Sequence, residues 1–427
     1  MESLLIQHGR LIDPASGIDS EMDVLLRDGR VAAVAAPGTL RGPTESTFNA
    51  RGCIVAPGLI DVHVHLREPG QPHKETIASG TSAAAAGGFT SVCAMPNTSP
   101  VNDSPEITRW MQAPDRGALV NVFPIAAATL GSAGETLTDF AALRRAGAVA
   151  FSDDGKPILY DEVMRDALKA AARLKAPVVQ HAEDTRVTVG CSMNYGPTSF
   201  RLGVHGMPNS AESRIVERDI ALARETGGHL HVAHLSTREA LGAVRAAKRR
   251  QLRVSAEVTP HHFTLLDENV GEFNTHYKMN PPLRAADDRD ALIEGILDGT
   301  IDVIASDHAP HAFHEKQVEF ERAAFGITGL ETALTLALTV LHHHFGLPLA
   351  RVVELMSTNP ARLFGLEGRG TLAKGAHADV TIFDPSKKWT FEAARSLSKS
   401  KNTPFDGWSF TGRAVATIVG GIVMYQQ

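Results

Sequence analysis

The hydrophobic positions in the middle of the chain form short runs that alternate with amphipathic stretches. Eight runs are predicted as strands: Gly58–Leu66, Phe89–Pro96, Val120–Ala127, Ala146–Asp154, Pro177–Asp184, His229–Ser236, Arg253–His261 and Asp302–Pro310. Stretches with helical periodicity lie between them, among them Asp161–Leu174, Ala211–Thr226, Thr237–Arg249 and Asp287–Leu297. This alternation predicts an α/β fold whose parallel strands close into a (β/α)₈ TIM barrel. An open doubly wound sheet is the alternative, but no glycine-rich phosphate-binding motif follows any strand.

The two chain ends have a different pattern, in which short apolar runs are separated by turn residues. The runs are Leu4–Ile6, Val24–Leu26 and Val31–Val34 near one end, and Asp379–Phe383 and Ala416–Val419 near the other. Strands at both ends predict a single small β-sandwich domain assembled from the two termini. We expect residues 1–56 and 369–427 to form this domain and residues 57–368 to form the barrel. The irregular run Gly190–Pro208 predicts a long loop after the fifth barrel strand.

Composition narrows the class of protein. The chain has 427 residues, 43% of them hydrophobic, and a net charge of −6, which gives no sign of a nucleic-acid or anionic-membrane partner. The three cysteines, Cys53, Cys93 and Cys191, form no CxxC pair, so we expect a reduced, cytoplasmic protein. The N-terminal residues lack the basic region of a signal peptide. The apolar stretch Thr332–Leu341 is too short to span a membrane and predicts a core helix.

Histidine and aspartate gather where the predicted strands end. In a barrel of this type, the loops that follow the strands form the mouth, where catalytic groups lie. Five strand ends carry such residues, in the segments Asp61–Arg67, Phe151–Gly155, Gln180–Asp184, His234 and Ser306–His311. The closed barrel therefore brings these side chains together around one axis.

Four of the 19 histidines are candidate metal ligands. His63 and His65 lie two residues apart, so strand alternation places both on one face at the mouth. His181 and His234 follow two further strands. Either one alone could be an ordinary buried histidine, but together with the first pair they favour a metal site.

The remaining histidines have other interpretations. A second HxH pair, His229 and His231, is predicted to pack in the interior or to support the site. His342, His343 and His344 fall at a helix end, where cations favour the helix dipole, and are predicted to be solvated. The roles of His261 and His262 stay open.

Imidazole and carboxylate ligands together suit Zn²⁺ rather than Mg²⁺ or Ca²⁺. There are more candidate ligands than the coordination positions of one tetrahedral site, so two metals about 3.5–4 Å apart explain them better. Two adjacent cations need a negatively charged bridge, for which Asp153 and Asp154 are both placed. Asp307 is the natural base to take a proton from the attacking water and return it to a leaving nitrogen.

The segment Gly58–Gly70, which reads GLIDVHVHLREPG, resembles the dihydroorotases of the amidohydrolase superfamily. Five further segments resemble the bacterial long-chain class of that family: Ala94–Thr98, Phe151–Gly155, Met279–Arg284, Asp307–His311 and Phe325–Thr332. The likeness runs from residue 1 to residue 427.

The resemblance implies specific roles. His63, His65 and Asp307 would hold one metal, His181 and His234 the other, and Asp154 rather than Asp153 would bridge them. It also implies substrate contacts from His65, Leu66, Arg67, Asn97, Asn280, His311, Phe325 and Gly326. The Arg67 guanidinium suits a substrate carboxylate because its donors match both oxygens. The reaction implied is (S)-dihydroorotate plus water giving N-carbamoyl-L-aspartate, the third step of pyrimidine synthesis.

One departure from the wider superfamily separates the alternatives. Hydantoinases, allantoinases and other dihydroorotases bridge their metals with a carboxylated lysine at the fourth strand end. No lysine lies within Ala146–Gly155, and Lys156 is expected in the solvated loop, which favours an Asp-bridged dihydroorotase. Non-catalytic relatives that scaffold aspartate transcarbamoylase have lost metal ligands, whereas all six ligand positions are filled here. We therefore expect an active enzyme that forms homo-oligomers; an aspartate transcarbamoylase partner stays an open alternative.

Overall fold

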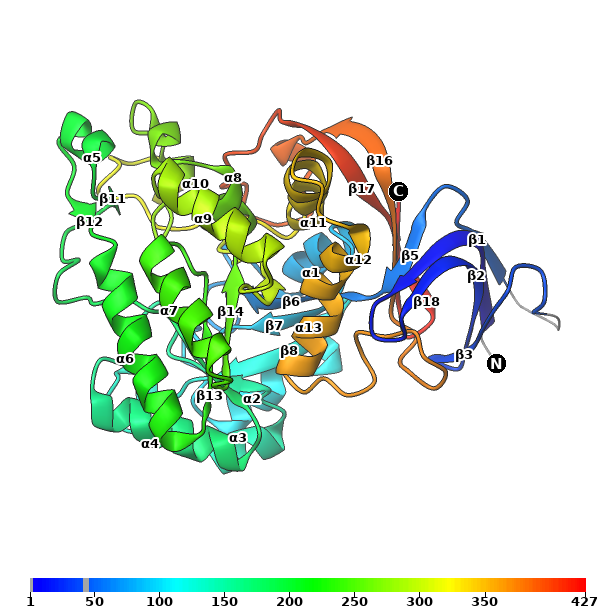
Figure 1. Ribbon diagram of the computed structural model, residues 1–427, viewed down its shortest axis with the longest axis horizontal. Helices are drawn as coiled ribbons and strands as arrows, with labels where there is room; N and C mark the ends of the chain where they lie inside the picture. Colours follow the sequence, from blue (N-terminus) through cyan, green and yellow to red (C-terminus); the bar gives the residue numbers. More distant parts are fainter. Residues whose placement is uncertain (1–2, 41–45) are drawn as a thin grey trace.

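The computed structural model describes residues 3–40 and 46–427 and contains a parallel barrel with helices around it (Figure 1). The eight barrel strands follow one another in chain order around the sheet. The His65 amide donates to the His308 carbonyl at 2.9 Å, and Val64 bridges His308, so the first strand meets the segment after the last. The strands are β6 (Leu59–Val64), β7 (Phe89–Ala94), β8 (Asn121–Ala126), β9 (Ala150–Phe151), β10 (Pro177–Gln180), β13 (His229–Val232), β14 (Val254–Val258) and β15 (Val303–Ile304). The predicted TIM barrel is confirmed.

The helices surround the barrel and bury their apolar faces against it. The four predicted helices are present within a residue or two of their expected bounds, as α4 (Asp161–Arg173), α6 (Ser210–Thr226), α7 (Arg238–Arg249) and α9 (Ala286–Leu297). Thr237 caps α7 by accepting from the Ala240 amide. The others are α1 (Ile77–Ala86), α2 (Pro105–Met111), α3 (Phe140–Ala146), α8 (Pro260–Thr264), α10 (Phe313–Lys316), α11 (Ala333–Leu336), α12 (Leu349–Val353) and α13 (Asn359–Leu363).

The remaining helical elements are π-helical stretches and 3₁₀ turns. The apolar stretch Thr332–Leu341 is a buried helix, as predicted: α11 continues into a π-helical stretch, η5 (Ala337–His344). A second π-helical stretch is η6 (Glu354–Thr358). Single 3₁₀ turns are η1 (Pro114–Arg116), η2 (Leu130–Ser132), η3 (Asp267–Val270), η4 (Thr275–Tyr277) and η7 (Ala393–Arg395).

The chain ends form one β-domain beside the barrel, as the sequence pattern predicts (Figure 1). Hydrogen bonds join its strands into one eight-stranded sheet, in which β5 of the N-terminal part pairs with β16 of the C-terminal part. This domain has its own hydrophobic core, separate from that of the barrel. Its strands are β1 (Ser3–Asp13), β2 (Ile18–Arg27), β3 (Arg30–Ala35), β4 (Ser46–Asn49), β5 (Ile54–Pro57), β16 (Val380–Thr390), β17 (Ser409–Val419) and β18 (Ile422–Gln426).

Several predicted elements differ from the structure in their bounds; the fifth, sixth and eighth barrel strands end earlier than predicted, at Gln180, Val232 and Ile304. The fourth barrel strand is only Ala150–Phe151, because α3 extends to Ala146 and the left-handed Gly147 ends it. The seventh ends at Val258, because Pro260 begins a helix there. The run Gly190–Pro208 is not a plain loop: it contains β11 (Met193–Asn194), α5 (Pro197–Leu202) and β12 (Gly206–Met207).

Residues 396–402, here called the crossing segment, connect the β-domain strands β16 and β17 but contact the barrel mouth. The Ser398 hydroxyl and the Lys399 amide donate to Glu75, which precedes α1. The Asn402 side chain donates to the carbonyls of Ala309 (2.9 Å) and Gly326 (3.0 Å) and accepts from the His311 amide (2.9 Å). The domain boundaries at residues 56/57 and 368/369 stay a prediction, and the crossing segment links the two parts across them.

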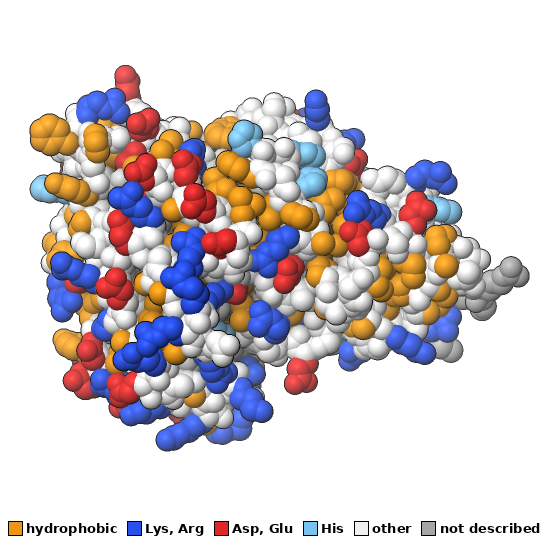
Figure 2. All heavy atoms as spheres, viewed as in Figure 1, with side chains coloured by type: hydrophobic (Ala, Val, Ile, Leu, Met, Phe, Trp, Pro, Cys, Tyr) orange, Lys and Arg blue, Asp and Glu red, His pale blue; other side chains and the backbone are white. Residues whose placement is uncertain are grey.

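The surface carries charges of both signs. On the face seen in Figure 2, Lys and Arg side chains are interspersed with Asp and Glu over the helices, and no single sign dominates. Among the described residues, no helix has the length and apolar character needed to cross a membrane.

Candidate metal and substrate site

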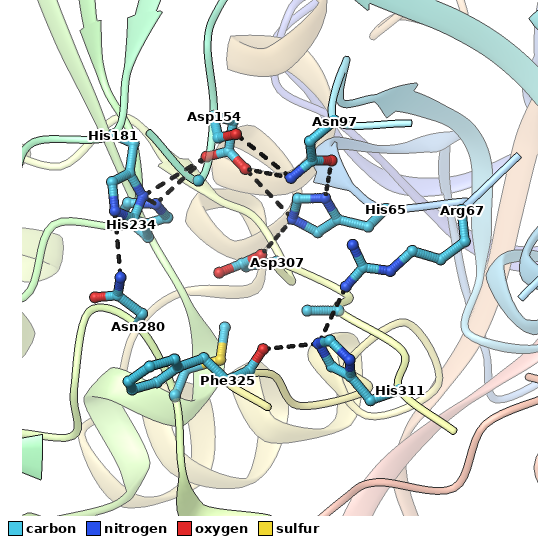
Figure 3. Close-up of a pocket in the computed structure, with 13 residues that line it drawn as sticks. His65, Arg67, Asn97, Asp154, His181, His234, Asn280, Asp307, His311 and Phe325 are labelled. Carbon is cyan, nitrogen blue, oxygen red and sulfur yellow. Dashed lines mark hydrogen bonds and ion pairs between the residues drawn. The ribbon is translucent and has the colours of Figure 1, made fainter. Parts of the chain in front are cut away.

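A cavity of about 280 Å³ lies at the barrel mouth, where the strands end (Figure 3). Its wall combines histidines, carboxylates and the Asn97 amide on one side with an arginine, a second amide and an aromatic ring on the other. The lining residues are His65, Arg67, Asn97, Asp154, Gly155, His181, His234, Met279, Asn280, Asp307, Ala309, His311 and Phe325.

Strand β6 supplies the first histidine pair. His63 is fully buried, and its Nδ1 lies 2.5 Å from Glu257 Oε1. His65 directs Nδ1 to the amide oxygen of Asn97 at 2.8 Å. Because an amide or carboxylate oxygen accepts, each Nδ1 carries the hydrogen and each Nε2 offers a lone pair to the cavity side.

The second histidine pair follows two neighbouring strands farther around the barrel, β10 and β13. His181 Nε2 lies 3.0 Å from Glu183 Oε2, and its Nδ1 lies 2.9 Å from His234 Nε2. His234 has a φ of 32°, a rare conformation for a residue with a side chain. The barrel thus directs a nitrogen of each ring toward the same point.

Asp154 lies among all four histidines, whereas Asp153 does not. Its Oδ1 is 3.4 Å from His63 Nε2, 3.6 Å from His234 Nε2 and 3.8 Å from His181 Nδ1. Its Oδ2 is 3.5 Å from His65 Nε2. The neighbouring Asp153 instead accepts from the Thr129 amide at 2.9 Å and from the Thr129 hydroxyl.

Asp307 approaches the first pair from the end of the eighth strand. Its Oδ1 is 3.1 Å from His65 Nε2 and 3.4 Å from His63 Nε2. It has a φ of 46°, and Arg67 has a φ of 61°. Asp307, Arg67 and His234, all of the cavity wall, therefore hold strained backbone, a feature that clusters at functional sites.

The electrostatics of the cluster favour cations. Burial opposes ionisation of Asp154 and Asp307, yet the nearby His63 holds the pKa of each well below its ordinary value. Burial likewise opposes a charge on His63, but Asp307, Asp154 and Glu257 raise its pKa well above the ordinary value. The site therefore attracts positive charge even without a bound ion.

The donor set fits divalent metal ions. Three groups of buried side chains each bring their ligand atoms within 4.8 Å of one another: His63–His65–Asp154, His63–His234–Asp307 and Asp154–His181–His234. Asp154 is common to the first and the third group. Moreover, His63 Nε2 and Asp154 Oδ1 are buried without a hydrogen-bond partner, which is costly unless a ligand satisfies them.

The opposite wall carries the polar groups expected to bind substrate. Arg67 donates from Nε to the Pro310 carbonyl at 3.1 Å and places one terminal nitrogen 3.3 Å from His311. Burial lowers the pKa of Arg67 to about 10, so the guanidinium stays charged at neutral pH. His311 donates to the Phe325 carbonyl at 2.8 Å, and Asn280 donates to Glu183 at 2.9 Å.

Comparison with known proteins decides the family. Residues 52–240 match a family model described as dihydro-orotase-like. The dihydroorotase of Solibacter usitatus is 51% identical over 98% of this chain and 97% of its own length. That of Pelobacter propionicus is 50% identical over the full length of both chains. The chain belongs to the dihydroorotase family.

Solved structures show the same fold outside the dihydroorotases. The L-hydantoinase of Arthrobacter aurescens has a TM-score of 0.89 and 25% identity, and the match covers 99% of this chain and 96% of that one. The dihydropyrimidinase of Brevibacillus agri has a TM-score of 0.84 and 22% identity, covering 99% and 94%. Sequence identity thus groups the chain with dihydroorotases, while the barrel-plus-β-domain architecture is shared more widely.

Three residues expected at the dihydroorotase site do not line the cavity: His63, which is fully buried behind it, and the expected substrate contacts Leu66 and Gly326. The Leu66 side chain is buried in the hydrophobic core instead. At Gly326 the amide donates to the Lys278 carbonyl (3.0 Å), so this N–H is already occupied. A Cβ at Gly326 would come within 2.5 Å of the Ala309 carbonyl oxygen, which explains why glycine stands beside the cavity.

Two carboxylates that contact the candidate site residues escaped the sequence reasoning. Glu183 bonds both His181 and Asn280, and Glu257 bonds His63 from β14, which is separated from β6 by β15 in the closed barrel. Burial opposes ionisation of each, but the partner histidines lower the pKa of both to about 2. Glu183 has a local signal, because it follows His181 by two residues. Glu257 has none, since its partner His63 lies 194 positions away.

The other histidines lie outside the cavity wall. His262 contacts Thr259 and the Pro281 carbonyl at 3.0 Å, and the His261 Nε2 is buried without a partner. His342 bonds the Leu347 carbonyl and His343 the Pro385 carbonyl, at the end of η5. Lys156 is exposed.

Proposed function

We propose that this chain interconverts (S)-dihydroorotate and N-carbamoyl-L-aspartate, the third step of pyrimidine synthesis. The observation that carries the proposal is about 50% identity, over the full length, to enzymes named dihydroorotase. The cavity chemistry supports it. Dihydroorotate combines a carboxylate with a cyclic amide, and the cavity combines a charged guanidinium with a cluster of histidines and aspartates.

The proposed cofactor is Zn²⁺, with two ions per subunit. His63, His65 and Asp307 would hold one ion and His181 and His234 the other, with Asp154 between them. This division is supported by the three overlapping ligand groups and by the position of Asp154 among four imidazoles. Ions bound there would supply Lewis acidity toward the ring carbonyl and make water a nucleophile at neutral pH.

The protein side chains orient the substrate and move the proton. Arg67 and Asn97 would bind the substrate carboxylate by charge-assisted and neutral hydrogen bonds. Asn280, His311 and Phe325 would contact the ring. As the water oxygen bonds to the ring carbonyl carbon, Asp307 would accept its proton and then donate it to the ring nitrogen as the C–N bond breaks. The reverse sequence closes the ring.

The competing function is that of a hydantoinase or allantoinase. The shared fold makes it a fair rival, since the L-hydantoinase structure matches 99% of this chain. The site argues against a lysine bridge, because the cluster at the fourth strand end contains Asp154 and the nearby Lys156 is exposed. A non-catalytic scaffold is the other rival.

One set of assays separates the three. Purified protein supplied with Zn²⁺ should cyclise carbamoyl aspartate and hydrolyse dihydroorotate, with no turnover of allantoin or hydantoin. Rapid turnover of hydantoin or allantoin and none of dihydroorotate would contradict the proposal. Full metal occupancy with no turnover of any of these compounds would support the scaffold.

The assembly and location of the protein stay predictions. We expect a homo-oligomer in the cytoplasm, and we keep a complex with aspartate transcarbamoylase as a further expectation. Size-exclusion chromatography with light scattering, run with and without that transcarbamoylase, tests the first and last of these.

A further inference from the structure

The second HxH pair lies inside the barrel, and hydrogen bonds connect it to the candidate metal ligand His63. His229 and His231 are two residues apart on β13, so both side chains point to the same face. The same holds for Ser255 and Glu257 on the adjacent strand β14, whose Ser255 pairs with His231. His231, Ser255 and Glu257 are buried in the interior.

These four side chains form a continuous hydrogen-bonded chain that ends on a proposed metal ligand. His229 Nε2 lies 2.7 Å from Ser255 Oγ, and Ser255 Oγ lies 2.8 Å from His231 Nδ1. His231 Nε2 lies 3.0 Å from Glu257 Oε2, and Glu257 Oε1 lies 2.5 Å from His63 Nδ1. The chain therefore runs from the beginning of β13 to the His/Asp cluster at the mouth.

The chemistry of the groups fixes the direction of every hydrogen bond. An ionised carboxylate only accepts, so Glu257 takes hydrogens from His63 Nδ1 and from His231 Nε2. A neutral His231 then has a lone pair on Nδ1, which accepts from the Ser255 hydroxyl. Ser255 in turn accepts from His229 Nε2–H. His63 is left with its lone pair on Nε2, the atom that is buried without a partner beside Asp154.

The end of the hydrogen-bonded chain that is farther from His63, at His229, lies beside a cavity at the other end of the barrel. His229 lines a separate cavity of about 340 Å³, together with Lys175, Arg253 and Arg362. Lys175 lies just before β10 and Arg253 just before β14, so this cavity lies where the barrel strands begin. The chain thus connects the two ends of the barrel interior.

We propose that His231, Ser255 and His229 are positioning residues for His63, acting through Glu257. They hold the Glu257 carboxylate in place and fully bonded, so that it fixes the His63 ring with Nε2 toward the cation. This inference rests on the proposed metal role of His63. A carboxylate partner of a ligating histidine fixes its tautomer and strengthens metal binding, and loss of such a partner costs about 10–100-fold in affinity.

The rival explanation is that the chain only satisfies polar groups in a tightly packed core. Packing and hydrogen bonding can be separated at His231, because its ring also packs edge-on against Phe364, with ring centroids 5.2 Å apart. Phe364→Leu disturbs that contact and leaves every bond of the chain intact. His231→Gln keeps an N–H that reaches Glu257, whereas His231→Phe has none.

The first measurement is Zn²⁺ affinity, by competition with a chelator. His231→Phe should lower the affinity by about 10–100-fold. Ser255→Ala should lower it less, and His229→Phe least, because each lies one bond farther from Glu257. His231→Gln and Phe364→Leu should stay within about threefold of the parent protein, because both keep the donor to Glu257. Equal losses for His231→Gln and His231→Phe, or an equal loss for Phe364→Leu, would overturn the proposal.

A double variant tests whether the residues act along one path. Ser255→Ala combined with His231→Phe should bind Zn²⁺ no more weakly than His231→Phe alone, because the path is already cut. Additive losses would mean that Ser255 acts independently of His231, and that the hydrogen-bonded residues do not act along one path.

The second measurement needs no metal. In the metal-free protein, at a pH above the raised pKa of His63, ¹⁵N NMR of the histidine side chains should show the hydrogen of the neutral His63 ring on Nδ1, and His231→Phe should increase exchange between its two tautomers. An unchanged His63 spectrum in His231→Phe would contradict the proposal. If the parent protein binds no Zn²⁺, the proposed metal site fails, and this spectrum still tests the positioning role by itself.

Discussion

The two HxH pairs of this chain have the same spacing, both lie on parallel barrel strands, and yet their surroundings differ. His63 and His65 stand at the end of β6, where Asp154 and Asp307 reach both rings within 3.1–3.5 Å. His229 and His231 stand at the start of β13, near Ser255. Position along the strand, rather than the motif, decides which groups each pair meets.

The pairs also differ in what is left unsatisfied. Both ring nitrogens of His231 have hydrogen-bond partners, whereas His63 Nε2 has none and faces a similarly unpartnered Asp154 oxygen. A buried donor or acceptor without a partner destabilises a fold unless a ligand completes it. His63 thus keeps a buried, unsatisfied nitrogen beside a carboxylate, as expected of a metal ligand, whereas both nitrogens of His231 are satisfied within the protein.

The largest expected difference is between two single variants, one lacking His63 of the first pair and the other lacking His229 of the second. His63→Ala should lose bound metal and activity together, with a fall in affinity beyond the roughly 100-fold that loss of a supporting partner costs. His229→Ala should still bind its full complement at saturating Zn²⁺. Metal analysis and turnover of dihydroorotate measure both. Normal metal content in His63→Ala would show that this pair is not the metal-binding one.

The neighbouring aspartates should differ almost as strongly. Asp154→Ala should lose metal and activity, because less negative charge would separate two adjacent cations. Asp153→Ala should keep its metal and show a milder loss, since its carboxylate bonds Thr129 instead. Metal content by elemental analysis distinguishes them. If only the Asp153 variant loses metal, the bridge has been assigned to the wrong residue.

Arg67 should matter for substrate and not for metal. Arg67→Met removes charge-assisted hydrogen bonds worth roughly 1.5–3 kcal/mol, so kcat/KM should fall at least about tenfold. Metal content should match that of the parent protein. Unaltered steady-state kinetics would place Arg67 outside the substrate site.

A smaller effect should appear in the pH dependence of stability. Burial, with His231 and the nearby Arg253, lowers the pKa of His229 to about 3 in the folded state. The unfolded chain therefore binds more protons between about pH 6.5 and pH 3, and the folded state loses stability as the pH falls through that window. His229→Gln lacks this titration. Urea unfolding at pH 7 and pH 5 should show a smaller loss for the variant than for the parent, and equal losses would contradict the assignment.

No effect at all is expected from bicarbonate. A carboxylated lysine forms only with CO₂, whereas an aspartate carries its charge at any pH above about 4. Metal-free protein given Zn²⁺ in CO₂-depleted buffer should regain the same activity as in bicarbonate. A strict need for bicarbonate would point to a lysine bridge instead of Asp154.

The sequence was informative about elements whose cause is local. Helix α7 begins where Thr237 caps it, and the strand runs that end in His63 and Asp307 are apolar and bounded by turns. The metal candidates could be predicted because a barrel places all strand ends at one mouth. The strand β9 was overestimated, since α3 extends to Ala146 and the left-handed Gly147 that ends it lies inside the predicted strand.

Two features could not be predicted from the sequence: the direction in which a side chain points, and contacts between residues that are far apart along the chain. Asp153 and Asp154 are adjacent and chemically identical, and only their backbone geometry sends one to Thr129 and the other to the histidines. Glu257 meets His63 only through barrel closure. Leu66 adjoins the substrate residues in sequence, yet its side chain is in the core.

The crossing segment has a consequence for the order of events during synthesis. Asn402 ties together the loops that carry His311 and Gly326, and Ser398 reaches Glu75, whose carboxylate also contacts His308. These residues leave the ribosome after every barrel strand. A nascent chain released up to Asp307, three residues beyond β15, therefore holds all six proposed metal ligands but not the ties that complete the rim. We expect the barrel to form first and the competent mouth to form only when translation is nearly finished.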